Sequence, residues 1–330
     1  MASSEREELG GKIKKGEVAF FRRAMRIALI GFAAFGEAVL KAILERGWKV
    51  VGVFTMPDDP TGKPNPLKQT ALNLGIPLFQ PENWRDPTVY ESFKKLNPDL
   101  GVMAYVTKII PIEIIKLPRL GTIEYHPSLL PKHRGASAIN WAIINGETKT
   151  GVTIFWPDAG IDTGPILLQK EVDIDPDDTA GSLYYNKLFP IGVEAMIEAI
   201  EMIERGTAPK IPQDESQATY EPPCTEERAI IDWSQPVDKV YNLIRGTNPR
   251  PGATTYYKGV KLKIFDCLKL DKPKKTSYGE VVEIRSDGFV VSAKDGAILV
   301  KKVQPLGSPK ISAAEYVKTA GLVEGSLLGR

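Results

Sequence analysis

The feature that most constrains the fold is an alternation of short apolar runs with amphipathic stretches in the first half of the chain. An apolar run at residues 26–30 ends at Gly31, residues 37–44 place apolar side chains at helical spacing, and residues 48–54 return to an apolar run. This alternation predicts a doubly wound, mostly parallel α/β sheet with helices on both faces, in which ligands bind beyond the carboxyl ends of the strands. Further strands are expected at 76–79, 100–106, 121–125 and 151–156, and further helices at 64–74, 87–96, 111–115, 136–144 and 179–205, the last broken near Pro190.

The composition changes after residue 206. Residues 207–223, TAPKIPQDESQATYEPP, are dense in Pro, Gln, Ser and Thr, which is typical of a linker. A helical stretch at 237–245 and short strand-like runs follow, with turn residues between the runs, and they predict a small β-barrel or sandwich. We therefore expect an N-terminal extension at 1–24, an α/β domain at 25–206, a linker at 207–223 and a small C-terminal β-barrel domain at 224–330. The strand-like runs lie at 253–257, 260–265, 279–284, 288–292 and 297–303.

Charge and cysteine content exclude several classes of protein. The chain carries 43 Lys plus Arg against 41 Asp plus Glu, a net charge of +2, so it has no strong overall attraction to nucleic acid or anionic membrane. Residues 251–330 are more basic, which indicates either a solvated lysine-rich surface or a weak footprint for an anionic partner. Two unpatterned cysteines favour a reducing cytosol and no metal site. No apolar run is long enough to span a membrane, and residues 1–24 lack the apolar centre of a secretory signal.

Two glycines, Gly31 and Gly36, follow the first expected strand, where a dinucleotide fingerprint would lie. The required G-x-G-x-x-G spacing is absent, and no acidic residue closes the second strand. The pair therefore predicts a tight turn between strand and helix, and no NAD site.

Both histidines of the chain lie in one stretch, HPSLLPKHRG, at residues 126–135. In an extended strand, Glu124 and His126 share one face and Tyr125 points to the other. His126 then stands where the strand ends, a position suited to an acid or base near neutral pH or to a structural histidine. His133 is expected at the surface or rim, because it is flanked by Lys132 and Arg134.

A carboxylate follows the strand expected at 151–156. Asp162 lies in the loop PDAGIDTG, among small and turn-forming residues. It either caps the loop as an Asx-type turn or, placed opposite His126, fixes the tautomer of the imidazole or relays a proton.

The residues at these positions resemble a known family. HPSLLPKHRG followed by GVTIFWPDAGIDTG is similar to the signature of folate-dependent formyltransferases, whose doubly wound domain uses 10-formyltetrahydrofolate as the formyl donor. RIALIG near the start, and IIDWSQPVDKVYNLIRGTNPRPGA and KKVQPLGSPKISAAEYV after the linker, resemble a family member with the C-terminal barrel domain of methionyl-tRNA formyltransferase. The resemblance covers the chain from about Met25 to the C-terminus, and it makes residues 25–206 the catalytic formyltransferase domain.

Two branches of the family compete. The stretches MPDDPTGKPNPLK, ENWRD and IEYHPSLLPKHRGASAINW resemble most closely the hydrolase domain of 10-formyltetrahydrofolate dehydrogenase. Methionyl-tRNA formyltransferases usually carry a longer, more basic insertion after the second strand, used against the tRNA, and here that insertion is short and nearly neutral. The lysine-rich C-terminal domain keeps the tRNA branch open.

The resemblance implies roles for particular residues. His126 matches the catalytic histidine, as acid/base or oxyanion stabiliser, and Asp162 matches the aspartate that positions it and assists proton transfer. The stretch Lys108, Ile109 and Ile110 matches the backbone that holds the pterin. The turn Ser128, Leu129, Leu130 and Pro131 matches the segment that contacts the folate.

Glu124 departs from the family pattern. Most formyltransferases place there an asparagine whose amide donates to the developing oxyanion, and the dehydrogenase-type domains have an apolar residue. Loss of one such donor costs about 2.7–4 kcal/mol in comparable sites. Glu124 is therefore protonated and donates, or turns away, or formyl transfer is slow or altered.

These implications define the expected function. We expect an enzyme, cytoplasmic and without metal, that removes the formyl group from 10-formyltetrahydrofolate and gives it to water or to an unidentified acceptor. The alternative is a methionyl-tRNA formyltransferase acting on initiator tRNA. A sugar-nucleotide amine as acceptor and a non-catalytic folate-binding protein remain open.

Overall fold

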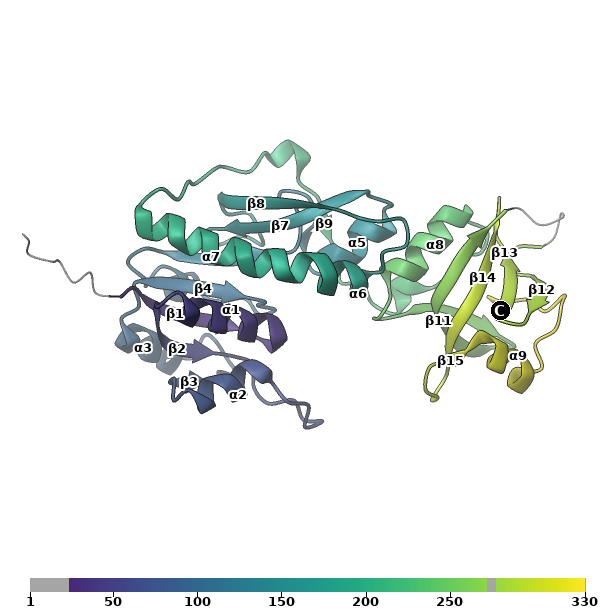
Figure 1. Cartoon of the computed structure of the whole chain (residues 1–330), viewed down its shortest axis with the longest axis horizontal. Helices are drawn as coiled ribbons and strands as arrows, with labels where there is room; N and C mark the ends of the chain where they lie inside the picture. Colours follow the sequence, from purple (N-terminus) through teal and green to yellow (C-terminus); the bar gives the residue numbers. More distant parts are fainter. Residues whose placement is uncertain (1–23, 272–276, 330) are drawn as a thin grey trace, which may run out of the picture.

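A seven-stranded sheet forms the first part of the computed structural model, which describes residues 24–271 and 277–329 (Figure 1). Its strand order is β3-β2-β1-β4-β5-β7-β8. The strands from β3 to β5 pair in parallel, whereas β5 with β7 and β7 with β8 pair antiparallel. The prediction of a doubly wound, mostly parallel α/β sheet is thus confirmed. The strands are β1 (Arg26–Gly31), β2 (Lys49–Phe54), β3 (Leu78–Phe79), β4 (Leu100–Ala104), β5 (Thr122–His126), β7 (Lys149–Phe155) and β8 (Ile166–Asp173).

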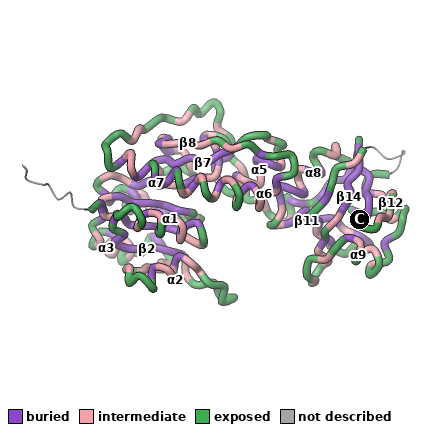
Figure 2. Tube along the Cα trace, in the orientation of Figure 1, coloured by how far each residue is buried: buried purple, intermediate pink, exposed green. Residues whose placement is uncertain are grey.

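Helices cover both faces of this sheet because successive strand residues point to opposite sides. On β1, Ile27 and Leu29 pack in one cluster with residues of α1 and α7, whereas Ala28 and Ile30 pack in another with residues of α3 and α4. The central strands are accordingly buried along almost their whole length (Figure 2). The helices are α1 (Ala33–Glu45), α2 (Pro66–Asn73), α3 (Pro87–Leu96), α4 (Ile112–Ile115), α5 (Ala138–Ile144), α6 (Ala180–Leu183) and α7 (Phe189–Arg205).

Local sequence signals explain where individual elements begin and end. Asp86 caps α3 by accepting a hydrogen bond from the backbone N–H of Thr88, Pro87 occupies the first turn, and Asn97 ends the helix at a φ of 46°. The helix expected at 179–205 is interrupted by a π-helical turn at Tyr184–Leu188, directly before Pro190. Proline has no N–H to donate to the preceding turn, which accounts for an irregularity at this place. The strand β8 was not predicted from the sequence.

The segment at 207–223 has few regular elements, in keeping with a linker, yet it contacts the first domain along much of its length. Its strand β9 (Tyr220–Glu221) pairs with β6 (Arg134–Gly135), and Ile211 forms a bridge with Ile166 at the start of β8.

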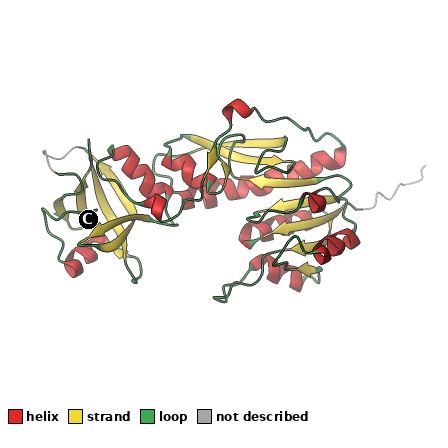
Figure 3. Ribbon diagram, turned by 180° about the vertical axis from the view of Figure 1, so that it is seen from behind, coloured by secondary structure: helices red, strands yellow, loops and turns green. Residues whose placement is uncertain are grey.

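A second, mainly antiparallel sheet follows (Figure 3). Its strand order is β10-β11-β14-β13-β12, with β15 paired to β14. Residues near the C-terminus join the two outer strands, because Leu328 bridges Tyr257 of β10 and Leu327 bridges Glu280 beside β12. The expected small barrel is therefore present, with a separate core. Its elements are α8 (Val237–Gly246), β10 (Ala253–Tyr257), β11 (Val260–Leu270), β12 (Val281–Arg285), β13 (Gly288–Ser292), β14 (Ala297–Pro305), β15 (Ile311–Ser312) and α9 (Ala313–Ala320).

The two sheets are connected through α8, which lies against α5. Tyr241 of α8 donates its hydroxyl hydrogen to Asp177 at 2.7 Å, and Arg245 donates to the carbonyl of Asp178 at 3.0 Å. In the other direction, Asn140 of α5 donates to the carbonyl of Gly246 at 2.7 Å.

Two further expectations concern the N-terminal extension and the absence of a membrane-spanning segment. The predicted N-terminal extension lies, apart from residue 24, outside the described residues. Within the described part of the chain, no helix has the length and apolar character needed to cross a bilayer.

The closing contact of the barrel gives a first prediction. Leu328 is 3% exposed and packs with Trp233, whereas the adjacent Leu327 is 39% exposed. We expect Leu328→Ala to lower the free energy of unfolding by about 2–5 kcal/mol, the usual range for truncating a buried leucine. Urea unfolding followed by tryptophan fluorescence measures the change, and Leu327→Ala is the matched control. Equal effects of the two substitutions would show that the tail does not close the barrel.

Candidate active site

The candidate active site forms where the end of β5 meets the loop between β7 and β8. Strand pairing sets Glu124 opposite Phe155 and His126 opposite Thr153. Tyr125, on the other face of β5, packs against Phe35 with ring centroids 4.2 Å apart and the ring planes tilted. The alternation expected from the sequence therefore holds, and Glu124 and His126 share one face of the strand.

The structure brings His126 and Asp162 together, although they are 36 positions apart in the chain. The Nδ1 atom of His126 lies 3.6 Å from Oδ2 of Asp162, and Nε2 lies 2.8 Å from the carbonyl oxygen of His133. Because a carbonyl can only accept, Nε2 carries a proton, and Nδ1 is the ring atom that faces the carboxylate. The same Oδ2 atom accepts a hydrogen bond from the backbone N–H of Gly135 at 2.7 Å. This arrangement leaves Nδ1 available to exchange a proton beside Asp162.

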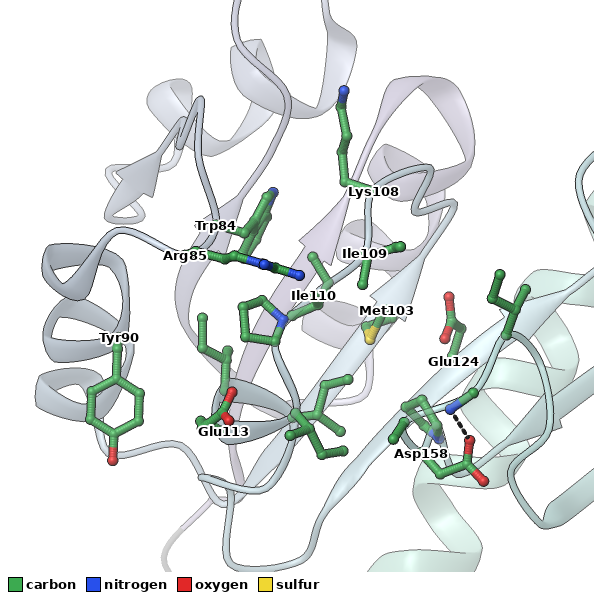
Figure 4. Close-up of a pocket in the computed structure, with 18 of the residues that line it drawn as sticks. Trp84, Arg85, Tyr90, Met103, Lys108, Ile109, Ile110, Glu113, Glu124 and Asp158 are labelled. Atoms are coloured by element: carbon green, nitrogen blue, oxygen red, sulfur yellow. Dashed lines mark hydrogen bonds between the residues drawn. The ribbon is translucent and has the colours of Figure 1, made fainter.

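Glu124 faces the same space as Asp162 and does not turn away from it (Figure 4). Burial raises the pKa of its carboxyl from 4.5 to about 8, and the negative charge of Asp162 adds to the increase. Near neutral pH the Glu124 carboxyl therefore keeps its proton for most of the time. A neutral carboxyl is a hydrogen-bond donor, which is the property that the family asparagine supplies at this position.

Glu124 and Asp162 line a cavity of about 830 Å³, whereas His126 does not belong to its described lining and reaches the site through Asp162. Figure 4 shows Glu124, Met103 and Ile110 on the wall of the cavity, with Trp84 and Arg85 on the side away from Glu124. Apolar and aromatic walls with a few polar groups suit a flat heterocyclic ligand. The lining residues are Trp84, Arg85, Asp86, Pro87, Tyr90, Met103, Lys108, Ile109, Ile110, Pro111, Ile112, Glu113, Ile114, Ile115, Glu124, Phe155, Pro157, Asp158, Ala159, Gly160, Ile161 and Asp162.

The residues expected to hold a substrate divide into two groups. Lys108, Ile109 and Ile110 line the cavity; Ile110 is buried, Ile109 is 79% exposed, and the Lys108 side chain extends away from Glu124 (Figure 4).

The turn formed by Ser128, Leu129, Leu130 and Pro131 does not belong to the described lining of this cavity. Ser128 donates to the carbonyl of Lys132 at 2.7 Å, and the N–H of Leu130 donates to Thr153 of β7 at 3.1 Å. Leu130 packs with Phe155. The turn thus holds the end of β5 against β7, and its contact with a ligand stays a prediction.

The structure corrects the expectation that His133 lies at the surface. His133 is buried between Glu147, 2.8 Å from Nε2, and Glu221, 3.2 Å from Nδ1. Burial lowers the pKa of the imidazole, but the two carboxylates together outweigh it, so the pKa is raised. Lys132 and Arg134 suggested exposure, whereas the partners of His133 come from distant segments that local composition does not reveal.

The glycine turn after β1 is accounted for by packing. A Cβ atom at Gly31 would lie 2.8 Å from the carbonyl oxygen of Ala104, and one at Gly36 would lie 2.9 Å from a methyl group of Leu67. Gly31 thus requires glycine for its close approach to the backbone of β4, whereas at Gly36 a larger residue would displace the Leu67 side chain.

Within residues 24–271 and 277–329, no group of three or more His, Cys, Asp or Glu side chains is arranged to hold a metal ion. The groups that the site itself presents are an imidazole, a carboxylate and a neutral carboxyl group beside an apolar cavity.

The doubly wound sheet and the C-terminal barrel define a two-domain α/β protein. Residues 25–200 match the family model described as Formyl transferase, and residues 223–321 match that described as Formyl transferase, C-terminal domain. The chain belongs to the formyl transferase family, as its motifs predicted.

Relatives from both branches are similar to this chain. The cytosolic 10-formyltetrahydrofolate dehydrogenase of Mus musculus is 42% identical over 309 residues, which are 89% of this chain and 34% of that protein. The chain therefore spans about a third of the length of that dehydrogenase. The methionyl-tRNA formyltransferase of Moorella thermoacetica is 39% identical over 310 residues, which are 92% of this chain and 99% of that protein.

Solved structures agree with the fold. An N-formyltransferase from Helicobacter canadensis, in complex with folinic acid and dTDP-3-aminofucose, matches with a TM-score of 0.67 at 21% identity and covers 85% of this chain and 99% of that chain. HypX from Aquifex aeolicus, in complex with tetrahydrofolic acid, matches with a TM-score of 0.65 at 23% identity, covering 89% of this chain and 47% of that chain. At these identities the likeness supports the fold alone.

The raised pKa of Glu124 predicts a pH-dependent stability. In the unfolded chain this carboxyl ionises above its ordinary value of 4.5, whereas the folded protein holds the proton up to a pKa of about 8. The free energy of unfolding therefore falls as pH rises through this window, by at most about 1.4 kcal/mol per pH unit for this one group. Glu124→Gln removes the ionisation, so we expect the variant to become more stable than wild type as pH increases from about 5 to about 8.

Urea unfolding of both proteins across this pH range measures the difference. Glu113→Gln, at another carboxyl on the cavity wall, is the control. If the difference in the free energy of unfolding between Glu124→Gln and wild type does not change with pH, Glu124 is ionised in the folded protein.

Proposed function

We propose that this chain is an enzyme that removes the formyl group from 10-formyltetrahydrofolate and transfers it to water or to an acceptor nucleophile. The observation that carries the proposal is that Glu124 and Asp162 line one cavity of about 830 Å³, with Nδ1 of His126 3.6 Å from the Asp162 carboxylate. The name of the dehydrogenase relative supports 10-formyltetrahydrofolate as the donor, and the name of the Moorella relative supports transfer of a formyl group. We place the reaction in the cytosol, in line with the two free cysteines, Cys224 and Cys267.

The three groups take different parts in the proposed reaction. The Asp162 carboxylate accepts a proton from the attacking nucleophile, while the nucleophile's own reacting atom forms the new bond to the formyl carbon; when the nucleophile is water, that atom is its oxygen. The formyl oxygen becomes an oxyanion, and the protonated Glu124 donates a hydrogen bond to it. Asp162 passes the proton from the nucleophile to Nδ1 of His126, and Nδ1 donates it to the folate nitrogen as the oxyanion re-forms the carbonyl and the carbon–nitrogen bond breaks. With water as nucleophile the products are tetrahydrofolate and formic acid, which becomes formate by releasing its proton to solvent.

Water is the nucleophile that we favour. The sequence stretches around His126 resemble the hydrolase domain of the dehydrogenase, and Glu124 replaces the asparagine usual in transferases. The short, nearly neutral segment at 56–68 after β2 offers little positive charge to a nucleic acid.

Methionyl-tRNA formyltransferase is the second candidate, and a specific observation favours it. The Moorella protein of that name is matched over 99% of its length, so the match includes both domains. The C-terminal domain also carries exposed or half-buried lysines on its strands, among them Lys261, Lys301 and Lys302. An acceptor tRNA bound through such lysines would show an affinity that falls steeply with salt.

One assay separates these functions. The protein is incubated with 10-formyltetrahydrofolate, with and without methionyl initiator tRNA, and the release of tetrahydrofolate is followed. We expect release without tRNA. Release only with tRNA would support the second candidate, and folate binding without any release would identify a non-catalytic binding protein.

The same assay tests the site. We expect His126→Ala to lower turnover by about 10²–10⁴-fold, the usual contribution of a positioned acid or base. Lys41→Ala is the control, since Lys41 is an exposed residue of α1 whose side chain pairs with Glu37. Unchanged turnover in His126→Ala would remove this histidine from the mechanism.

The protonation state of Glu124 predicts a pH profile. Activity requires the neutral carboxyl, so turnover falls as pH rises above the pKa of about 8, by about tenfold per pH unit. Glu124→Gln keeps a donor at every pH, so we expect this variant to lose the alkaline decline. Rates measured from about pH 6 to about pH 10 test this, and an alkaline decline that persists unchanged in the variant would assign it to another group.

A further inference from the structure

The segment between the two domains lies along the loop that carries Asp162. The backbone groups of Ile211 and Ile166 exchange two hydrogen bonds, at 2.8 and 2.9 Å. Trp156, at the other end of the loop, donates its indole N–H to the carbonyl of Pro209 at 2.9 Å. The segment that composition marks as a linker therefore contacts both ends of the loop at 156–166.

Gln213 makes the central contact of this segment. Its Nε2 atom donates to the carbonyl oxygen of Asp162 at 2.8 Å and to that of Gly164 at 2.7 Å. Its Oε1 atom accepts from Nε of Arg134 at 3.1 Å and from Nη2 of Arg134 at 2.7 Å. Carbonyls only accept and a guanidinium only donates, so the amide can be oriented in one way and all four of its hydrogen-bonding positions are used.

Arg134 is itself held firmly. Its side chain is fully buried, and its two terminal nitrogens donate to the two carboxylate oxygens of Glu215 at 2.9 and 2.7 Å. The hydroxyl of Tyr220 accepts a further hydrogen bond from Nη1 at 2.8 Å. A bidentate pair of this kind fixes the plane of the guanidinium, and with it the position of the Gln213 amide.

These contacts close a ring around Asp162. The backbone N–H of Gly135, the residue after Arg134, donates to the Asp162 carboxylate, while Arg134 holds Gln213 and Gln213 holds the Asp162 carbonyl. Asp162 has a φ of 55°, in the left-handed region that non-glycine residues rarely adopt. Such a conformation persists where the surroundings determine it, and here both ends of the residue are bound.

We propose that Gln213 is a positioning residue for the formyl-transfer reaction, acting through the backbone of Asp162 to hold its carboxylate beside His126. This inference rests on the proposed function for its catalytic consequence. The segment at 211–221 is accordingly part of the active site and not merely a connection between domains. Gln213 does not belong to the described lining of the cavity, so substrate binding does not depend on it directly.

Three variants test the role. Gln213→Ala removes the amide, and Gln213→Glu keeps its size and its contact with Arg134 but places an acceptor against two carbonyl oxygens. Gln217→Glu is the matched control, because Gln217 lies in the same segment, is exposed, and donates to Asp214 and not to the loop.

We expect both Gln213 variants to lower kcat by about 10–100-fold, which is the loss that a displacement of about 1 Å produces. The dissociation constant for tetrahydrofolate, measured by calorimetry, stays unchanged, and so does kcat of Gln217→Glu. An unchanged kcat in both Gln213 variants, or an equal loss in the control, would overturn the proposal.

A second measurement does not depend on activity. Hydrogen–deuterium exchange of the ligand-free proteins reports the order of residues 157–165, and we expect faster exchange there in Gln213→Ala than in wild type or Gln217→Glu. Unchanged exchange would contradict the positioning role even if the enzyme acts on another substrate. If the wild-type protein releases no tetrahydrofolate, the proposed function is rejected. If Gln213→Ala nevertheless exchanges faster than wild type at residues 157–165, the role of Gln213 in ordering Asp162 is retained.

Discussion

The site depends on the carboxyl groups of Glu124 and Asp162, which face one cavity. Ionising both groups at once would cost free energy, because each charge disfavours the other. Glu124 lies in a surrounding that solvates charge poorly, and the charge of Asp162 disfavours a second negative charge nearby. Asp162, in contrast, accepts the backbone N–H of Gly135 and lies beside the imidazole of His126. The proton is therefore held on Glu124, which acts as a donor, while the Asp162 carboxyl accepts a hydrogen bond from Gly135.

The fold produces this division through the geometry of a single strand. Alternation along β5 places Glu124 and His126 on one face, while Tyr125 is fixed on the other by Phe35. Antiparallel pairing of β5 with β7, and of β7 with β8, then brings the loop at 156–165 back to the same edge, where Asp162 lies beside Nδ1 of His126. The carbonyl of His133 fixes the other ring nitrogen, and the two carboxylates around His133 hold that residue in place. Each functional group is thus oriented by backbone that is itself tied to the sheet.

Much of this arrangement could be predicted from the sequence because it depends on local periodicity. The strands of the first domain follow from apolar runs, and the face shared by Glu124 and His126 follows from the two-residue repeat of a strand. Asp162 could be singled out because it stands in a turn-rich loop directly after a strand. The motifs around these residues identified the family, which the matches of both domains confirm.

Other features of the site depend on contacts between segments that are distant in the chain, and no local sequence pattern predicts such contacts. His133 looked exposed because its neighbours are basic, but its partners Glu147 and Glu221 come from a loop and from the inter-domain segment. Arg134 likewise showed no sign of full burial, since its partners Gln213 and Glu215 lie about eighty positions away in a stretch with the composition of a linker. The strand β8 was missed because its alternation of half-buried and exposed residues is weak beside the apolar runs of the central strands.

The central claim, that Glu124 holds a proton beside an ionised Asp162, is open to direct measurement. Carbon-13 NMR of protein labelled at the glutamate side-chain carboxyls, with Glu124→Gln used to assign the resonance, gives the pKa of this group in the ligand-free protein. The account predicts a pKa for Glu124 of about 8. A value close to the ordinary 4.5 would place a second negative charge in the cavity and would contradict the account.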